Sequence, residues 1–271
     1  MTSPSTGVRP LSNRLSRHSR LRGWALVLAA IPLWEVVRLL GGVSPLVMPP
    51  VSEVAHALIR AVWTGALLRQ VAISLAVIIG GAGFALVLAL IAVLIAGASK
   101  TVEAAIEILG SLLHPLPGIA LLPVIVLWFG IGPAAVLVVI IHSVFWPVLT
   151  NVQAGYRSIP ATWRMVAENY RVTGLGYLLR IALPATAPYL LAGLRIAWAR
   201  AWRALISAEM LFGAVAAGGG LGWFVHSRRV FMDTPGLFAG ILAVMAVGSF
   251  VESVVFSTVE ARTIRRWGMS S

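Results

Sequence analysis

Residues that could do chemistry interrupt an otherwise apolar stretch from 187 to 213. Its charged residues are Arg195, Arg200, Arg203 and Glu209. A charge inside a membrane-spanning helix costs about 2.5–3.5 kcal/mol on insertion scales, so it usually faces the protein interior or a water-filled cavity. At 100° per residue, Arg200, Arg203 and Ser207 fall within about 60° of one another. Arg195 and Glu209 lie on roughly the opposite face, which also carries two tryptophans.

The face that carries Arg200, Arg203 and Ser207 is predicted to line a substrate pathway. A positive lining attracts an anion and lowers the barrier to its passage. The alternative is that Arg195 and Arg200 lie near enough to the helix end to extend their guanidinium groups into the interface, whereas Arg203 is deeper. The opposite face is expected to pack against neighbouring helices or a paired subunit.

Other polar residues favour structure over catalysis. Glu252 is expected to form an ion pair with an arginine of the 187–213 stretch or with Arg38. The five histidines lack metal-ligand spacing, and Gly218–Gly222 has no lysine to make it a phosphate-binding loop, so a tight re-entrant turn is expected there. We therefore expect no catalytic residue, no metal site and no cofactor on this chain; any ATP and Mg²⁺ would bind a separate subunit.

Composition indicates an all-α membrane protein with several spans. Of the 271 residues, 59% are hydrophobic and 11% charged, and the mean hydropathy is +0.93. A soluble domain would be about a quarter charged. The net charge of +12 does not indicate nucleic-acid binding, because the basic residues are not clustered with aromatic ones.

A membrane-spanning helix needs about 20 apolar residues. Six spans are predicted, at about 23–40, 71–97, 104–128, 133–152, 187–213 and 237–259. The uncharged run from 115 to 151 is too long for one span and is divided at Phe129–Pro133, since glycine and proline end helices. The shorter piece 51–63 is predicted to be an interfacial helix with Ser52 as its N-cap.

Basic residues set the expected orientation. With the N-terminus inside, 13 of the 21 Lys and Arg residues fall on the cytoplasmic side and 5 on the other, which favours cytoplasmic N- and C-termini. Residues 1–20, rich in Ser, Thr and Arg, are expected to form a disordered cytoplasmic arm. Residues 21–271 then form a single transmembrane domain, with a long cytoplasmic loop at about 153–186.

That cytoplasmic loop is predicted to form a helix, a break and a second helix. Ser158–Pro160 is typical of a helix start, and 161–172 can form one helix. Thr173–Gly176 is expected to break it, 177–183 can form a second helix, and Pro184 is expected to stop or kink that helix. Such an element suits contact with another protein, although an amphipathic connector resting among lipid headgroups is equally compatible with the pattern.

Several motifs form a recognisable set: Ala167, Gly174, Ile181, Leu183, Pro184 and Pro188, then AGLRIAWARAWRALISAEML, together with MPPVSEV, PLPGIALLPVIVLWFGIG and GGGLGWFV. As a set they resemble the permease subunits of ATP-binding cassette (ABC) importers, and most closely the nitrate, sulfonate and taurine group. The resemblance covers the chain from about Met48 onward. It implies a type I importer bundle with six transmembrane helices, multi-pass in a bacterial inner membrane.

The resemblance also implies the partners. Two permeases would pair, as a homodimer or with a second type of permease, and a periplasmic or lipid-anchored binding protein would deliver the substrate, here a small organic or inorganic anion. The loop would dock in a groove of each of two ATPase subunits and couple ATP hydrolysis to transport. A membrane-embedded enzyme or an unpowered channel is the rival class. An enzyme would need a cluster of intramembrane acids or histidines, and a channel would not need the structured loop.

The loop departs from the family pattern at three positions, one of them the first alanine of the triplet, where Val166 stands. The pattern is Glu-Ala-Ala, three residues, Gly, nine residues, then Ile, one residue and Leu-Pro. With Ile181 and Leu183–Pro184 as the anchor, Met165 stands at the glutamate position and Arg171 at the glycine position. Glu168, one turn later on nearly the same face, is a candidate substitute for the glutamate. These departures raise the hypothesis of pairing with a second permease that carries the usual residues. The alternative, a homodimer with a drifted motif, is favoured over it.

The charge asymmetry predicts Lys100 and Arg164 inside, and Trp63 and Arg228 outside. Because the chain has no cysteine, single cysteines introduced at these positions can be labelled without background. An impermeant thiol reagent added outside should modify positions 63 and 228 only. Labelling of position 164 from outside would overturn the predicted orientation.

Overall fold

The computed structural model describes residues 17–212 and 219–263, and this part of the chain is helical without a β-strand. The α-helices are α1 (Arg17–Leu40), α2 (Val51–Trp63), α3 (Ala66–Ala98), α4 (Lys100–Leu113), α5 (Leu122–Phe129), α6 (Pro133–Arg157), α7 (Ala161–Asn169), α8 (Gly174–Tyr177), α9 (Leu183–Phe212), α10 (Leu221–Val230), α11 (Thr234–Phe250) and α12 (Phe256–Arg262). A 3₁₀ turn, η1 (Gly118–Leu121), and two π-helical segments, η2 (Leu178–Ala182) and η3 (Val251–Val255), join some of them. Residues 1–16 of the expected N-terminal arm lie outside the described residues.

Four described helices are long and apolar enough to cross a membrane. They cover Ala66–Gly97, Pro133–Arg157, Leu178–Phe212 and Thr234–Arg262. A bent pair, Lys100–Leu113 with Gly118–Phe129, makes up to five. The remaining predicted span, 23–40, lies within α1, which has 24 residues, so six spans are compatible with the structure.

The predicted span at 104–128 is not one straight helix. The two helices of the bent pair meet at 91°, with Pro115 and Pro117 between them. Proline removes a backbone donor and clashes with the preceding turn, so the helix stops at Leu113. Arg200 of α9 then donates to the carbonyl of His114, at 2.7 Å, which is one of the carbonyls that a helix end leaves without an intrahelical partner.

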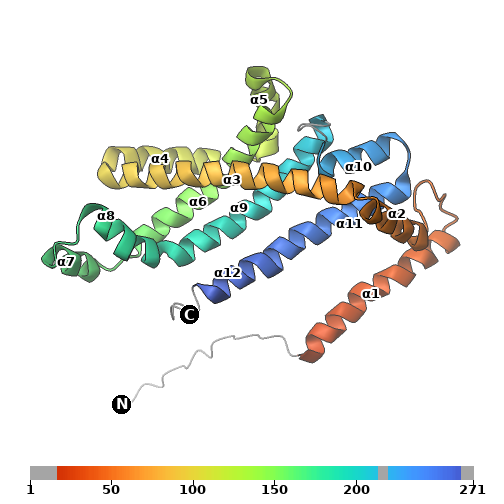
Figure 1. Cartoon of the computed structure of the whole chain (residues 1–271), viewed down its shortest axis with the longest axis horizontal. Helices are drawn as coiled ribbons and strands as arrows, with labels where there is room; N and C mark the ends of the chain where they lie inside the picture. Colours follow the sequence, from red (N-terminus) through yellow and green to blue (C-terminus); the bar gives the residue numbers. More distant parts are fainter. Residues whose placement is uncertain (1–16, 213–218, 264–271) are drawn as a thin grey trace, which may run out of the picture.

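α6 and α9 pack side by side at the centre of the bundle, with α3 against α6 (Figure 1). Close approach of α6 and α9 depends on small residues. A Cβ at Gly193 would lie 2.9 Å from Cβ of Asn151, and one at Gly155 would lie 2.8 Å from Cβ of Tyr189. The apolar side chains at the centre, such as Ile140 and Leu205, are fully buried. These three helices therefore form the core to which the functional segments attach.

A buried carboxylate joins three elements at the α10 end of this core. Ser74 of α3 donates to Glu209 of α9 at 2.8 Å, and the amide of Gly222 donates to the same carboxylate at 2.8 Å. Ser74 also accepts from the amide of Leu221, at 2.8 Å. Both amides belong to the first turn of α10, where an anion is favoured. We call Ser74, Glu209, Leu221 and Gly222 the Glu209 cluster.

The glycines beside the Glu209 cluster leave room for the carboxylate. A Cβ at Gly220 would lie 2.1 Å from Oε1 of Glu209, and one at Gly222 would lie 2.4 Å from the carbonyl oxygen of Ile206. The predicted tight turn at 218–222 is therefore the start of α10, although Gly218 itself lies outside the described residues.

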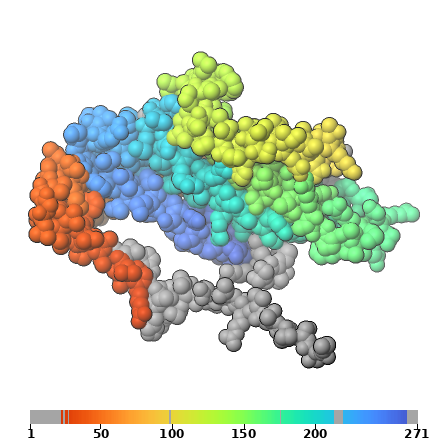
Figure 2. Space-filling view, turned by 180° about the vertical axis from the view of Figure 1, so that it is seen from behind, coloured from red at the N-terminus to blue at the C-terminus, as the bar shows by residue number. Residues whose placement is uncertain are grey.

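α1 stands away from most of the bundle and is attached to it by α2 and by an edge-on contact of Trp34 with Phe238 of α11, whose ring centroids are 5.1 Å apart (Figures 1 and 2). Trp34 donates to the carbonyl of Pro49 at 2.9 Å, and Glu35 accepts from the amide of Val51 at 2.7 Å. The predicted role of Ser52 as N-cap is wrong, because α2 begins at Val51 and the carboxylate of Glu35 satisfies its first amide. Glu35 also pairs with Arg38 at 2.8 Å, so Arg38 is not the partner of Glu252.

Substitution Gly222→Ala is expected to destabilise the fold by about 1–3 kcal/mol, because the added methyl forces backbone or carboxylate to move. The measurement is thermal unfolding in detergent, where the midpoint should fall. Gly80→Ala in α3 is the matched control, since a Cβ there meets nothing within 4 Å and alanine favours the helix. Equal midpoints for the two variants would contradict close packing around Glu209.

Candidate coupling loop and translocation face

α7 lies at one end of the long axis of the molecule, remote from α2 and α10 (Figure 1). Its Ala167 is buried against the chain. Exposed side chains surround this anchor, and apolar ones among them are Trp163, Met165, Val166 and Tyr170. Glu168, the candidate substitute for the family glutamate, is also exposed. An apolar surface beyond the end of a membrane span suits contact with a protein partner.

α7 ends three residues earlier than the predicted helix 161–172, and Arg171 is the reason. Its φ is 54°, in the left-handed region. The amide of Arg171 donates to Glu168 at 2.9 Å, and that of Val172 donates to Ala167 at 2.8 Å. This bonding pattern is the Schellman motif that ends many helices, and glycine is its usual left-handed residue. The helix therefore breaks before the predicted Thr173–Gly176, and Arg171 occupies a backbone conformation that suits the family glycine.

The second half of the loop runs directly into α9. Gly174 begins α8 with φ 56°, and η2, which contains Ile181, connects α8 to α9. Of the two effects expected of Pro184, to stop or to kink this helix, the first does not occur, because α9 begins at Leu183 and continues for 30 residues. Proline leaves a carbonyl one turn earlier without its usual partner, and a π-helical segment is a common way to accommodate this. Leu183 is partly exposed at the junction.

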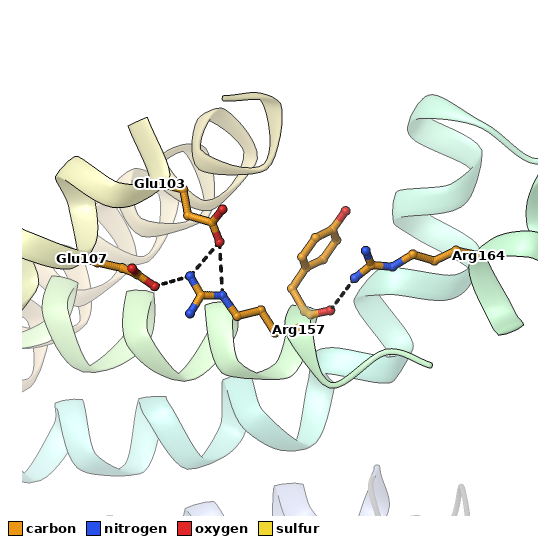
Figure 3. A network of polar contacts seen from close by, with 5 residues as sticks. Glu103, Glu107, Arg157 and Arg164 are labelled. Carbon is orange, nitrogen blue, oxygen red and sulfur yellow. Dashed lines mark hydrogen bonds and ion pairs between the residues drawn. The ribbon is translucent and has the colours of Figure 1, made fainter. Parts of the chain in front are cut away.

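Charged residues tie α7 to the bundle (Figure 3). Arg164 donates to the carbonyl of Tyr156 at 3.2 Å and lies over its ring at 5.2 Å from the centroid. Arg157, the residue after Tyr156, donates to Glu103 of α4 at 2.6 Å and also to Glu107. The connection thus runs from α7 through the end of α6 to α4. Sequence reasoning missed it, although Glu103 and Glu107 are four apart and share one helix face.

The structure places the predicted pathway residues on one side of α9. Arg203 is exposed on the single chain and donates to the carbonyl of Ala199 in its own helix, at 2.9 Å. Ser207 is half-buried one turn further along. Arg200 differs from both, because its guanidinium is held by the carbonyl at the end of α4, as described above. Arg203 is therefore the member of this face that no other helix holds within the described part of the chain.

The opposite face of α9 packs within the chain. Trp198 and Trp202 stack with ring centroids 5.5 Å apart, and Trp202 is buried. Arg195 pairs with Glu260 of α12 at 3.4 Å. Glu252 was expected to pair with an arginine of α9 or with Arg38, but it is exposed in the π-helical segment η3 and forms no ion pair within the described residues. Glu260, two turns later, takes that role.

Comparison with known proteins agrees with this architecture. Residues 85–265 match the family described as "Binding-protein-dependent transport system inner membrane component". The match covers well over half of the chain, including the second part of α3, all of α6 and α9, and the whole loop that contains α7. The chain belongs to this family of ABC transporter permeases.

Several relatives are similar over most of their length. The taurine transport system permease protein TauC of Escherichia coli K12 is 34% identical over 227 residues, which are 82% of this chain and 80% of TauC. The putative aliphatic sulfonates transport permease protein SsuC of Bacillus subtilis 168 is 28% identical over 88% of this chain and 85% of SsuC. The nitrate import permease protein NrtB of Leptolyngbya laminosa is 31% identical over 59% of this chain and 56% of NrtB.

Family membership confirms the resemblance seen in the sequence motifs. The members are multi-pass, non-catalytic subunits of the inner membrane, which work with an ATPase subunit and a substrate-binding protein. The geometry adds what this chain contributes: an anchored helix, α7, and a long helix, α9, that begins in the same loop.

Replacing Arg171 by glycine is expected to stabilise the end of α7 by about 1 kcal/mol, since an L-residue with a side chain pays roughly that to be left-handed. Amide hydrogen exchange at Val172 should slow about fivefold. Arg171→Ala removes the same charge but keeps the steric cost, so its exchange should not slow. Indistinguishable alanine and glycine variants would show that the left-handed backbone is not limiting.

Proposed function

We propose that this chain forms the translocation pathway of an ATP-driven importer for a small organic or inorganic anion. Membership of the binding-protein-dependent permease family carries the proposal. The relatives described above are named for taurine, aliphatic sulfonates and nitrate, whose common chemical feature is an oxyanion group. A guanidinium on an accessible face of a spanning helix suits such a group, because arginine binds oxyanions through two parallel hydrogen bonds.

In the proposed assembly, two permeases pair and enclose the pathway. Two copies of this chain are favoured over a pairing with a second type of permease. Two ATPase subunits, which carry the ATP and Mg²⁺ sites, drive the pair between inward-open and outward-open states, and a binding protein delivers the substrate at the opposite face. Arg200, Arg203 and Ser207 line the pathway. With both termini in the cytoplasm, α7 lies on the cytoplasmic side, where the ATPase subunits bind.

α7 is proposed as the coupling element because it combines an anchor with a docking surface. Ala167 fixes it to this chain, and Arg164 fixes it to the end of α6. The exposed Met165 and Glu168 are then free to contact an ATPase groove. The loop segment Gly174–Pro184 leads into α9, so a displacement of the loop moves the helix that carries Arg203.

Substitution Ala167→Asp is expected to uncouple ATP hydrolysis from uptake. The aspartate places an unpaired charge at a position that is only 3% exposed, which should cost several kcal/mol and displace α7. The measurement is substrate-stimulated ATPase activity of the complete transporter, alongside uptake. Ala161→Asp at the exposed start of α7 is the control. If Ala167→Asp kept wild-type stimulation and uptake, α7 would not be the coupling element.

Substitution Arg203→Gln is expected to reduce anion uptake at unchanged expression. Its side chain is bonded only to its own helix within the described chain, so the fold should tolerate the change. Uptake is measured with the complete transporter, and the affinity of the isolated binding protein should stay the same. Arg262→Gln, exposed at the end of α12, controls for loss of charge. A binding protein that holds only neutral or cationic ligands would contradict the proposed substrate class.

A further inference from the structure

A polar cavity lies apart from the translocation face, at the end of the bundle that carries α7. Its volume is about 410 Å³. The walls come from the last turn of α3, the first turn of α4, the end of α6 and the start of α7. Polar residues among its lining are Lys100, Glu103, Gln153, Tyr156, Arg157 and Arg164.

The charge of this cavity is positive. Arg157 is matched by the carboxylates of Glu103 and Glu107. Arg164 and Lys100 have no carboxylate partner within the described part of the chain. Arg164 is held in place by the ring and the carbonyl of Tyr156. That contact uses one of the five N–H donors of its guanidinium, so the others remain available to a ligand.

A neutral donor lies beside these cations. Nε2 of Gln153 is buried and has no hydrogen-bond acceptor within the described chain, and its residue lines the cavity. Leaving a buried donor without an acceptor is unfavourable. An oxygen-rich anion in the cavity would supply the acceptor and would meet Lys100 and Arg164 at the same time.

The remaining wall of the cavity is apolar. Val93, Ala96 and Gly97, from the last two turns of α3, form this wall, and Ser99 between α3 and α4 completes the lining. They lie where the apolar span Ala66–Gly97 ends, which is the depth at which a spanning helix meets lipid headgroups. A cavity that has cations on one wall and the end of a span on the other matches a phospholipid, whose phosphate and acyl chains are joined.

We propose that this cavity binds the phosphate group of an anionic phospholipid, with Lys100 and Arg164 as its cationic contacts and Gln153 as a donor. The proposal goes beyond the transport function. Only one part of it, the membrane leaflet that supplies the lipid, rests on the proposed topology. Arg164 belongs to α7, so a bound headgroup joins α7 to α3 and α4. The lipid thereby braces the coupling helix against the bundle.

The test is lipid binding by the purified full-length chain, measured by native mass spectrometry with phosphatidylglycerol and phosphatidylcholine. Lys100→Gln and Arg164→Gln are each expected to weaken phosphatidylglycerol binding about fivefold, the effect of about 1 kcal/mol per basic residue near an anionic headgroup. Phosphatidylcholine binding should not change. Lys100 is exposed and unpaired within the described chain, so Lys100→Gln should fold normally. Arg262→Gln is the matched charge control and should bind like the wild type.

A third variant separates a defined site from diffuse attraction. Gly97→Phe fills the cavity and keeps every charge; a Cβ at Gly97 meets nothing within 4 Å, so the fold should accept it. It should weaken phosphatidylglycerol binding as much as the charge variants. Phosphatidylglycerol binding unchanged by Gly97→Phe, or by both charge variants, would overturn the proposal.

A competition arm identifies the source of the phosphate. Inorganic phosphate is added to the lipid-bound protein at rising concentration and constant ionic strength. Persistence of the lipid supports the phospholipid as the occupant. The proposal would be overturned if low phosphate displaced the lipid from the wild type and displaced it equally from the Lys100→Gln and Arg164→Gln variants.

Discussion

A carboxylate buried among apolar helices needs hydrogen-bond donors held at fixed positions around it. In this chain Glu209 imposes that requirement on the helices that surround it. Its exposed fraction is 3%, and a charge or polar group without partners in such a place is costly. The partners come from α3 and from the first turn of α10, so three elements must meet at one point. The glycines at 220 and 222 follow from the same need, because only they let the chain approach the carboxylate closely.

The other end of the core is organised differently. There the contacts are exposed or half-exposed ion pairs and a cation–π contact, which link α7 to α6 and α6 to α4. Exposed pairs contribute little stability, so this end is easier to rearrange than the Glu209 end. A bundle that is held firmly at one end and loosely at the other fits a subunit whose loop moves with its ATPase while the helix α9 carries the movement inward.

Sequence reasoning worked where local chemistry decides the structure. The bounds of α2 and the break between α5 and α6 agree with the predictions because proline and glycine act on their own neighbours. It failed where a distant residue decides. The early end of α7 depends on Arg171 taking a conformation that arginine rarely adopts. An arginine of α9 pairs with Glu260 and not with Glu252, which lies in a π-helical segment that no hydrophobic pattern reveals.

The candidate site was predictable to a similar extent. The loop motifs located α7, and helical periodicity placed Arg200, Arg203 and Ser207 on one face of α9. Periodicity could not show that Arg200 reaches the carbonyl of His114, because that contact depends on the bend in the α4–α5 pair. Nor could it find the cavity beside Lys100, because its walls come from two pairs of helices, α3 with α4 and α6 with α7, that are distant from each other in the sequence.

Reconstitution tests most directly whether this chain is a powered import subunit. The purified chain is placed in liposomes alone, or together with its ATPase and binding protein, and uptake of a labelled oxyanion is followed with and without ATP at the α7 face. The account predicts accumulation only with the complete set and ATP, and no flux through the chain alone. Equal flux without the ATPase, running down the gradient, would contradict it and identify a channel.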